Sequence, residues 1–192
     1  MDEIVDEIWN LLHAGANVGR EHSPFTVLQA ATVGVDGAPA VRNVVLRRAS
    51  REDRSVTFHT DVRSQKVTEL RKDARISIVG SDFESGIQIR LQGIARIIED
   101  PEKTKPAWNL SRPRTLIVYS TPHIPGTPVA SPEDAYAKTD AGVDGESVGF
   151  ENFCLIDVRI SKIDYLNLYS TGHVRASLEH DGERWCGKWV AP

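Results

Sequence analysis

The sequence lacks the residue patterns of several specialised protein classes. It contains only two cysteines, Cys154 and Cys186, which are far apart and lack the short paired spacing of a zinc site or a redox motif. We interpret both as small buried apolar residues, and we expect no metal site and no disulfide framework. A basic excess is also missing, because 23 Lys and Arg stand against 27 Asp and Glu, a net charge of -4. This charge gives no attraction to nucleic acid or to an anionic membrane.

Long apolar runs and leader signals are missing as well. No stretch approaches the ~18 apolar residues that a membrane span requires, and residues 1–7 are acidic where a signal peptide would be basic. These features predict a cytoplasmic protein without a membrane partner. Glycine-rich phosphate loops, His-Glu-x-x-His and Gly-x-Ser-x-Gly are absent too, which removes most support for a nucleotide kinase or a hydrolase.

What is present is the composition of an ordinary globular protein. The 192 residues, 40% of them apolar and 26% charged, suit one domain over 1–192 with a sizeable core. Apolar residues at helical spacing predict an amphipathic helix over about 2–14, within an N-terminal helical region 1–20. Residues 120–149, rich in proline and glycine, are predicted to form a long loop with at most a turn or two of helix.

Strand patterns dominate the rest of the chain. Valine-rich segments 25–35 and 40–48 flank Asp36-Gly37, a turn that favours positive φ and therefore predicts a hairpin. One short helix is predicted to begin after Ser64, which would cap its N-terminus. Another is predicted over 101–110. Further strands are predicted over 55–60, 74–79, 87–98, 153–168 (with a bend near 162–164), 173–179 and 184–190. Without regular strand–helix alternation, this pattern predicts a mainly β fold, an antiparallel split β-barrel of six to eight strands with short flanking helices.

Basic and polar residues gather at the ends of these strands and at the start of the short helix. They are Arg42 and Arg47, His59 and Thr60, and Ser64 and Lys66. A helix N-terminus offers unpaired backbone N–H groups and a partial positive charge, to which Lys66 and the hydroxyl groups add donors. Arg42, one strand away, could complete a bidentate grip on a phosphate.

An alternative interpretation of the arginines stays open. Arg42, Arg47 and Arg48 could instead form a solvated edge that discourages sheet aggregation. Strict alternation also places Arg42 and Arg47 on opposite faces of their strand, so a shared ligand requires a bulge or a ligand that bridges two faces.

Four blocks of sequence resemble the pyridoxamine 5'-phosphate oxidase family. They are 42–47 (Arg-Asn-Val-Val-Leu-Arg), 58–66 (Phe-His-Thr-Asp-Val-Arg-Ser-Gln-Lys), 88–93 (Gln-Ile-Arg-Leu-Gln-Gly) and 173–175 (His-Val-Arg), followed by Trp185 and the closing Val190-Ala191-Pro192. Order and spacing agree from about Phe25 to Pro192. The resemblance implies an FMN-binding split barrel that is normally a homodimer with FMN at the subunit interface. Such an interface would also explain how two strand faces serve one cofactor.

The resemblance implies a set of site residues, position by position. Arg42 and Lys66 would hold the FMN phosphate. The full set of flavin contacts is Arg42, Asn43, Val44, Val45, Leu46, Arg47, His59, Thr60, Ser64, Gln65, Lys66, Gln88, Tyr165 and Arg175. Substrate contacts would be Arg47, Trp108, Arg112, Thr171 and His173, with Arg112 on a substrate phosphate, and His173 and Arg175 are the catalytic candidates.

The chain departs from the family pattern at several of these positions. Gln65 stands where a second basic residue usually meets the phosphate, a loss of about 1–3 kcal/mol of cofactor affinity. Arg47 replaces a lysine and Thr171 an arginine, while Trp108 and Leu116 replace a tyrosine and a serine. Because most of the substrate pocket is altered, FMN binding is better supported than oxidation of pyridoxamine 5'-phosphate.

The sequence therefore predicts an FMN-dependent oxidoreductase acting on an amine or alcohol such as pyridoxamine 5'-phosphate, with hydride transfer to flavin N5. The alternatives are a flavin reductase or related FMN oxidoreductase with another substrate, and a non-catalytic flavin-binding protein. A nucleic-acid-binding barrel is disfavoured because the aromatic residues do not interleave with the basic cluster. Plain structural roles remain open for His173 as a strand histidine, for Tyr165 as a core aromatic and for Trp108, Trp185 and Trp189 as packing residues.

Overall fold

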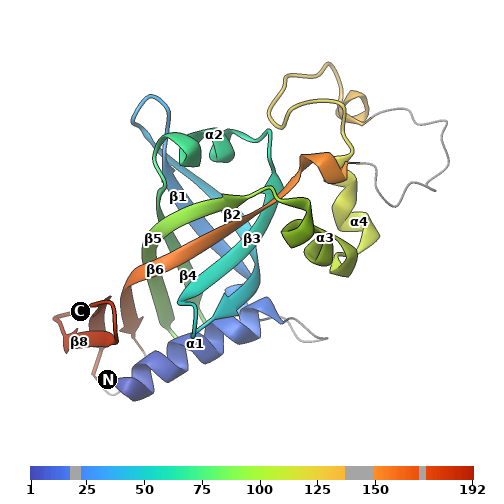
Figure 1. Cartoon of the computed structure of the whole chain (residues 1–192). Coiled ribbons are helices and arrows are strands. Elements are labelled where there is room, and N and C mark those ends of the chain that lie inside the picture. The colour runs from blue at the N-terminus through green and yellow to red at the C-terminus, as the bar shows by residue number, and fades with distance from the viewer. Residues whose placement is uncertain (18–22, 137–148, 169–171) are drawn as a thin grey trace.

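The computed structural model describes residues 1–17, 23–136, 149–168 and 172–192. These residues form one antiparallel sheet of eight strands in the order β3-β2-β1-β4-β5-β6-β7-β8, and a further pairing of β3 with β6 closes the first six into a barrel (Figure 1). The strands are β1 (Val27–Val33), β2 (Pro39–Ser50), β3 (Ser55–Asp61), β4 (Arg75–Asp82), β5 (Ile87–Ile98), β6 (Phe153–Asn167), β7 (Val174–His180) and β8 (Trp185–Trp189). The predicted antiparallel split barrel is confirmed.

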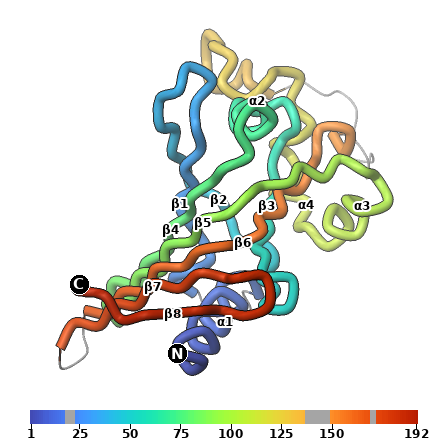
Figure 2. The backbone as a smooth tube through the Cα atoms, turned by 60° about the vertical axis from the view of Figure 1, so that its left-hand side comes forward, coloured from blue at the N-terminus to red at the C-terminus, as the bar shows by residue number. Residues whose placement is uncertain are grey.

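Short helices flank the barrel. They are α1 (Asp2–Ala16), α2 (Gln65–Lys72), α3 (Pro101–Leu110) and α4 (Pro113–Leu116), with single 3-10 turns η1 (Pro24–Thr26), η2 (Ile117–Tyr119), η3 (Pro132–Ala135) and η4 (Phe150–Asn152). Helix α1 lies across one end of the barrel and α2 lies at the other, as Figures 1 and 2 both show. The short helix α4, which begins with Pro113, was not predicted from the sequence.

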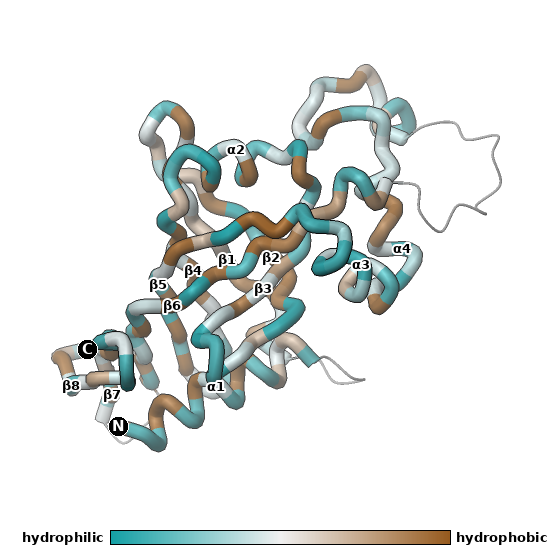
Figure 3. Tube along the Cα trace, viewed as in Figure 1, coloured by the Kyte–Doolittle hydropathy of each residue, from teal (hydrophilic) through white to brown (hydrophobic). Residues whose placement is uncertain are grey.

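One main core runs through the barrel from α1 to α2. Strand residues alternate between this interior and the outer surface, as in β5, where Ile87, Ile89 and Leu91 are buried and the residues between them are not. Figure 3 shows the same alternation of apolar and polar residues along the strands. Close packing of α1 depends on Gly15, because a Cβ there would lie 2.5 Å from the carbonyl oxygen of Phe25.

A second, aromatic core lies outside the barrel where α3, α4 and η2 cover the start of β6. We call it the aromatic cluster; it consists of Trp108, Tyr119, Phe153 and Leu155, with Ile98, Ala107, Leu116 and Phe150 packed against them. Ring centroids in the cluster lie 5.1 to 5.9 Å apart, and the rings are tilted or edge-on. Such edge-to-face contacts are favourable for aromatic quadrupoles and make the cluster rigid.

Local sequence signals are mostly confirmed, with two corrections. Gly37 has φ of +88° in the first hairpin, as its turn requires. Cys186 is exposed, not buried as predicted, because β8 is an edge strand, whereas Cys154 is buried in the core. Ser64 precedes α2, but its side chain makes no capping hydrogen bond and lies instead 3.3 Å from the hydroxyl of Thr60. Among the described residues, no helix is long and apolar enough to cross a membrane.

Candidate functional site

A polar group lies at the barrel end that α2 covers. Lys66 Nζ donates a hydrogen bond of 2.9 Å to Thr60 Oγ1, and both Thr60 and Ser64 are buried. Burial lowers the pKa of Lys66, and the positive charge of Arg42 acts in the same direction, so the two cations lie close together. Two cations and two hydroxyl groups beside the first N–H groups of a helix form a donor set that fits a phosphate.

Arg42 points from β2 into the same end of the barrel. Its Nη1 donates to the carbonyl oxygen of Ala40 at 3.0 Å and to Thr32 Oγ1, and its Nη2 forms an ion pair of 2.7 Å with Glu69 Oε2. The Arg42 side chain is 23% exposed, whereas that of Glu69 is fully buried. Arg42 is therefore not a solvated strand edge. Arg48 does remain at the surface, paired with Asp53.

The other predicted contacts on β2 divide between two faces. Asn43, Val45 and Arg47 are exposed on the outer face, whereas Val44 and Leu46 point into the core. A ligand can therefore meet only the backbone of these two residues. A bulge in the pairing of β2 with β3 lies at Arg47, but Arg42 and Arg47 still project to opposite faces.

His59 and Arg47 occupy the outer surface beside the aromatic cluster. Burial, and to a lesser degree the charge of Arg47, lowers the pKa of His59 to about 4, so the imidazole is neutral at pH 7. Its ring lies edge-on to Phe153 at 4.9 Å. Burial raises the pKa of Tyr119 to about 12, although the charge of Arg47 opposes this rise. Arg47 is thus close to both His59 and Tyr119.

Tyr119 is the residue in this region that sequence reasoning missed. It lies far from Arg47 and His59 along the chain, in the single turn η2. The carbonyl oxygen of Tyr119 accepts a 2.8 Å hydrogen bond from Asn152 Nδ2, which fixes the turn beside β6. The density of aromatic residues between Trp108 and Phe153 was the only available signal.

A second group of predicted flavin contacts lies on β5, β6 and β7. Gln88 pairs with Leu166 and Leu166 pairs with Arg175, so Gln88 and Arg175 share one cross-strand row. Burial alone would raise the pKa of Asp164, but hydrogen bonds from Arg175 and Arg90 outweigh it and hold the pKa below its usual value. Tyr165 points to the opposite face and is 1% exposed in the core, so its side chain takes the core role that the sequence left open.

The two groups lie apart within one chain. Figures 1 and 2 both place α2 at one end of the barrel, and β7 and β8 near the other end. Arg42, Thr60, Ser64 and Lys66 come together beneath α2, whereas Gln88 and Arg175 lie where β5, β6 and β7 meet. One chain alone therefore does not bring the whole predicted set to one place.

The predicted substrate contacts are dispersed as well. Trp108 is buried in the aromatic cluster, which agrees with a packing role. Arg112 is exposed at the start of α4, and His173 is exposed with Nδ1 at 2.9 Å from the carbonyl oxygen of Leu168. Thr171 lies outside the described residues. Gln65 is exposed at the start of α2.

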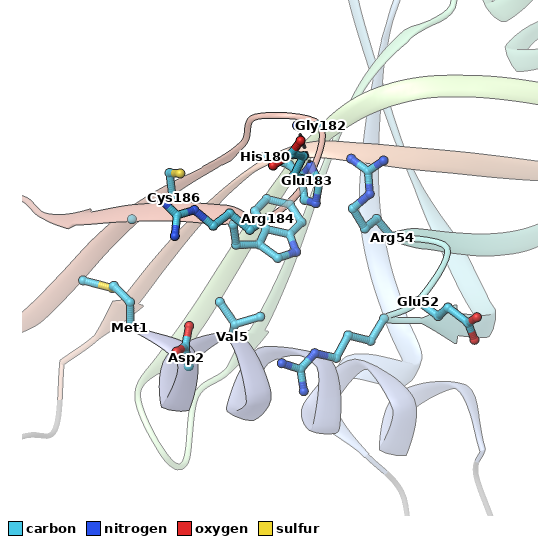
Figure 4. A pocket seen from close by; sticks show the side chains of 13 residues that line it. Met1, Asp2, Val5, Glu52, Arg54, His180, Gly182, Glu183, Arg184 and Cys186 are labelled. Carbon is cyan, nitrogen blue, oxygen red and sulfur yellow. Dashed lines mark hydrogen bonds between the residues drawn. The ribbon is translucent and has the colours of Figure 1, made fainter.

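A cleft of about 790 Å³ lies elsewhere, between the start of α1, the β2–β3 turn and the β7–β8 hairpin (Figure 4). The charged residues in its lining are three arginines and three carboxylates, namely Arg51, Arg54, Arg184, Asp2, Glu52 and Glu183. Their charges balance, and no predicted flavin contact lines the cleft. Among the described residues, no three His, Cys, Asp or Glu side chains are grouped to hold a metal ion.

Comparison with known proteins identifies related sequences. The sequence model of a family described as pyridoxamine 5'-phosphate oxidase, FMN-binding domain, matches residues 6–99, which include Arg42, Thr60, Ser64 and Lys66. The chain is 29% identical over 168 residues to pyridoxine/pyridoxamine 5'-phosphate oxidase 2 of Arabidopsis thaliana, which covers 83% of each protein. It is 30% identical over 134 residues to the pyridoxine/pyridoxamine 5'-phosphate oxidase of Xanthomonas euvesicatoria, over 67% of this chain and 64% of that protein.

Solved structures share the fold. A pyridoxamine 5'-phosphate oxidase-related, FMN-binding protein of Nostoc punctiforme superposes with a TM-score of 0.80 at 23% identity, over 97% of this chain and 96% of that one. PhzG of Burkholderia lata, in complex with tetrahydrophenazine-1-carboxylic acid, gives a TM-score of 0.71 at 22% identity, over 100% and 92% of the two chains. Together with the matched domain and the closed barrel, these relatives support a place for the chain in the pyridoxamine 5'-phosphate oxidase-like family of FMN-binding proteins.

Proposed function

We propose that the protein is an FMN-dependent oxidoreductase whose FMN phosphate binds beneath α2. The observation that carries this proposal is the meeting of Lys66, Thr60, Ser64 and Arg42 at one end of the barrel. From there the cofactor would pass over the barrel rim to the outer face of β2, where Asn43, Val45 and Arg47 are exposed. A ligand that spans both faces removes the conflict between the directions of Arg42 and Arg47.

When bound, FMN supplies two-electron chemistry by accepting a hydride at N5 from an amine or alcohol substrate such as pyridoxamine 5'-phosphate. The chain's own residues would orient that substrate. Arg47 offers a fixed positive charge, and neutral His59 offers hydrogen bonding without a charge of its own. Arg112, exposed at α4, would bind a substrate phosphate.

We also propose that two copies assemble around the cofactor. The outer face of β1 and β2 carries exposed Val27, Val41 and Val45, and Val27 and Val45 face each other in register. Burial of such apolar residues between two copies is favourable. A second copy would bring its Gln88 and Arg175 to the flavin, which supports a homodimer with FMN at the interface.

A second candidate, a flavin reductase that uses a reduced nicotinamide, is favoured by the aromatic cluster. Trp108 and Leu116 stand where the family has a tyrosine and a serine, and here both side chains pack against other apolar residues. Leucine has no hydrogen-bond donor, and Trp108, whose donor is its indole N–H, is only 4% exposed, so neither residue supplies the hydroxyl donor of a serine or a tyrosine. The surface beside Arg47 and His59 therefore offers fewer hydroxyl donors to a substrate phosphate than a surface that carries a tyrosine and a serine at these positions.

The test begins with reconstitution in excess FMN, removal of unbound flavin and a visible absorption spectrum. We expect about one oxidised flavin per chain. The replacement of both Arg42 and Lys66 by alanine is expected to abolish flavin retention, because two charge-assisted phosphate contacts are lost. The matched control is Arg48→Ala, another arginine of β2, whose partner is Asp53 at the surface. Full flavin content in the double variant would show that the phosphate binds elsewhere.

Anaerobic reduction of the bound flavin then separates the candidate activities. Pyridoxamine 5'-phosphate, pyridoxine 5'-phosphate, NADH and NADPH are added separately, and loss of the oxidised-flavin absorbance is followed. Bleaching by a vitamer phosphate supports the oxidase, and bleaching by a nicotinamide alone supports the reductase. No bleaching by any donor would leave a non-catalytic flavin-binding protein and contradict the proposed activity.

A further inference from the structure

Glu69 of α2 is a buried carboxylate whose two oxygens differ in their hydrogen bonds. Its Oε2 accepts hydrogen bonds of 2.5 Å from Thr32 Oγ1 and 2.7 Å from Arg42 Nη2. Its Oε1 is also buried, and no hydrogen bond reaches it from the described residues. Removal of a carboxylate from water is costly unless partners compensate. Among the described residues, both hydrogen bonds to the Glu69 carboxylate reach the same oxygen, and one of them comes from Arg42.

Within the described part of the chain, the contacts of Arg42 leave one part of its guanidinium without a hydrogen-bond partner. A guanidinium carries five N–H donors in a fixed planar fork. Nη1 donates to Thr32 and to the carbonyl of Ala40, and one hydrogen of Nη2 goes to Glu69. The Nε hydrogen and the second Nη2 hydrogen remain, and side by side they match the two oxygens of a phosphate.

The same ion pair lies close to the other cation of the site. The charge of Arg42 lowers the pKa of Lys66, and the charge of Glu69 opposes this effect, although burial has the largest influence. Glu69 is thus near Lys66 while it holds Arg42. Because Arg42 is 23% exposed, it is accessible at the barrel end and not enclosed like its partner.

We propose that Glu69 is a positioning residue of the FMN phosphate site: together with Thr32 it holds the guanidinium of Arg42 so that its unused donors face the phosphate. This inference rests on the phosphate placement proposed above. Preorganised donors bind more tightly, because the rotamer entropy of a long side chain is not lost again on binding. Glu69 acts through Arg42 and does not itself contact the cofactor, whose phosphate it would repel.

The test measures flavin affinity in the full chain after bound flavin has been removed. Flavin fluorescence is titrated with FMN and, separately, with riboflavin, which lacks the phosphate. Glu69→Gln keeps the size of the side chain and removes its charge, and it is expected to raise the Kd for FMN about tenfold, the order of one charge-assisted hydrogen bond. The Kd for riboflavin is expected to stay unchanged. The matched control is Glu99→Gln, which breaks the exposed ion pair with Arg71 of α2 and should alter neither Kd.

A double-mutant cycle separates positioning from general destabilisation. Arg42→Ala should weaken FMN binding, and addition of Glu69→Gln to it should cause no further loss, because Glu69 acts only through Arg42. If Glu69→Gln does not fold, Thr32→Val replaces it in the cycle, with a smaller loss expected in the same direction.

Each contrary outcome has a distinct meaning. An unchanged or tighter Kd for FMN in Glu69→Gln, equal losses for FMN and riboflavin, or additive losses in the cycle would overturn the positioning role. An unchanged Kd in Arg42→Ala would instead overturn the proposed phosphate site itself.

Discussion

At the scale of single residues, His59 makes the stability of the fold depend on pH. Its imidazole is held neutral by burial and by Arg47, with a pKa of about 4 in the folded chain, whereas an unfolded chain gives histidine a pKa of ~6.5. Between pH ~6.5 and ~4, His59 is therefore protonated in the unfolded state but neutral in the folded state. The contribution of neutral His59 to the free energy of unfolding is therefore fully present above pH ~6.5. As the pH falls toward 4, this contribution is lost, and the loss is on the order of 2–3 kcal/mol.

His59→Phe is expected to remove this part of the pH dependence, because phenylalanine keeps a ring beside Phe153 and cannot titrate. The measurement is the free energy of unfolding by urea at pH 7, 5.5 and 4.5 for both proteins. As the pH falls, the free energy of unfolding should decrease less in His59→Phe than in the wild type. His13→Phe, at an exposed position on α1, is the control. Parallel stability curves for wild type and His59→Phe would show that His59 does not titrate with folding.

The residue scale also shows what the sequence could and could not predict. Thr60, Ser64 and Lys66 are close along the chain, so their meeting in space follows from the short connection between β3 and α2. The partner of Arg42, Glu69, depends on how α2 packs against β1 and β2, which no local pattern reveals. Tyr165 shares the inward alternation of Ile163 along β6, so its core position was available from periodicity, but the family resemblance suggested a flavin contact.

At the scale of elements, Arg63 ties the turn after η2 to the β3–α2 connection. Its Nε donates to Asp61 Oδ1 at 3.0 Å, and its Nη1 and Nη2 both lie 3.2 Å from the carbonyl oxygen of Thr121. Asp61 is buried, so the pair is rigid. The start of the predicted 120–149 loop is thereby anchored at Thr121, beside the connection that leads into α2.

Arg63→Ala is expected to release this anchor without unfolding the barrel. Limited proteolysis should cut within 117–136 several-fold faster, because cleavage follows the population of the locally opened form. Mass spectrometry locates the cuts, and the thermal midpoint monitors the barrel. Arg114→Ala, exposed on α4, is the control. Equal cleavage rates for Arg63→Ala and wild type would mean that other contacts hold the segment.

At the scale of the whole molecule, the proposed homodimer would form through the exposed valines on the outer face of β1 and β2. Val45→Glu would place a charge in the proposed contact between two copies, where a buried unpaired carboxylate is costly. We expect a dimer in the wild type and a shift to monomer in the variant, measured by sedimentation velocity, together with weaker FMN retention. Phe83→Glu, on the exposed β4–β5 turn, is the matched control. A monomeric wild type with full FMN content would contradict the shared site.

The barrel was predictable as a fold class, but the strand pairing that closes it was not. Hairpin turns such as Asp36-Gly37 and the alternation along β5 indicate neighbouring antiparallel strands, and these were predicted. The pairing of β3 with β6 joins residues about a hundred positions apart, such as Thr57 and Asp157. Register over such a distance depends on the collective packing of the core and not on any local signal.

That long-range pairing has a consequence for how the chain is made. β6 pairs with β3, β5 and β7, and its residue Cys154 is the register partner of Thr60 in the phosphate site. During synthesis the barrel stays open until residues 153–167 have left the ribosome, so the nascent chain carries an unpaired β3 edge while about half of its length is made. The proposed phosphate site beside Thr60 would therefore be complete only after β6 has paired with β3, so FMN would bind there only to a nearly finished chain.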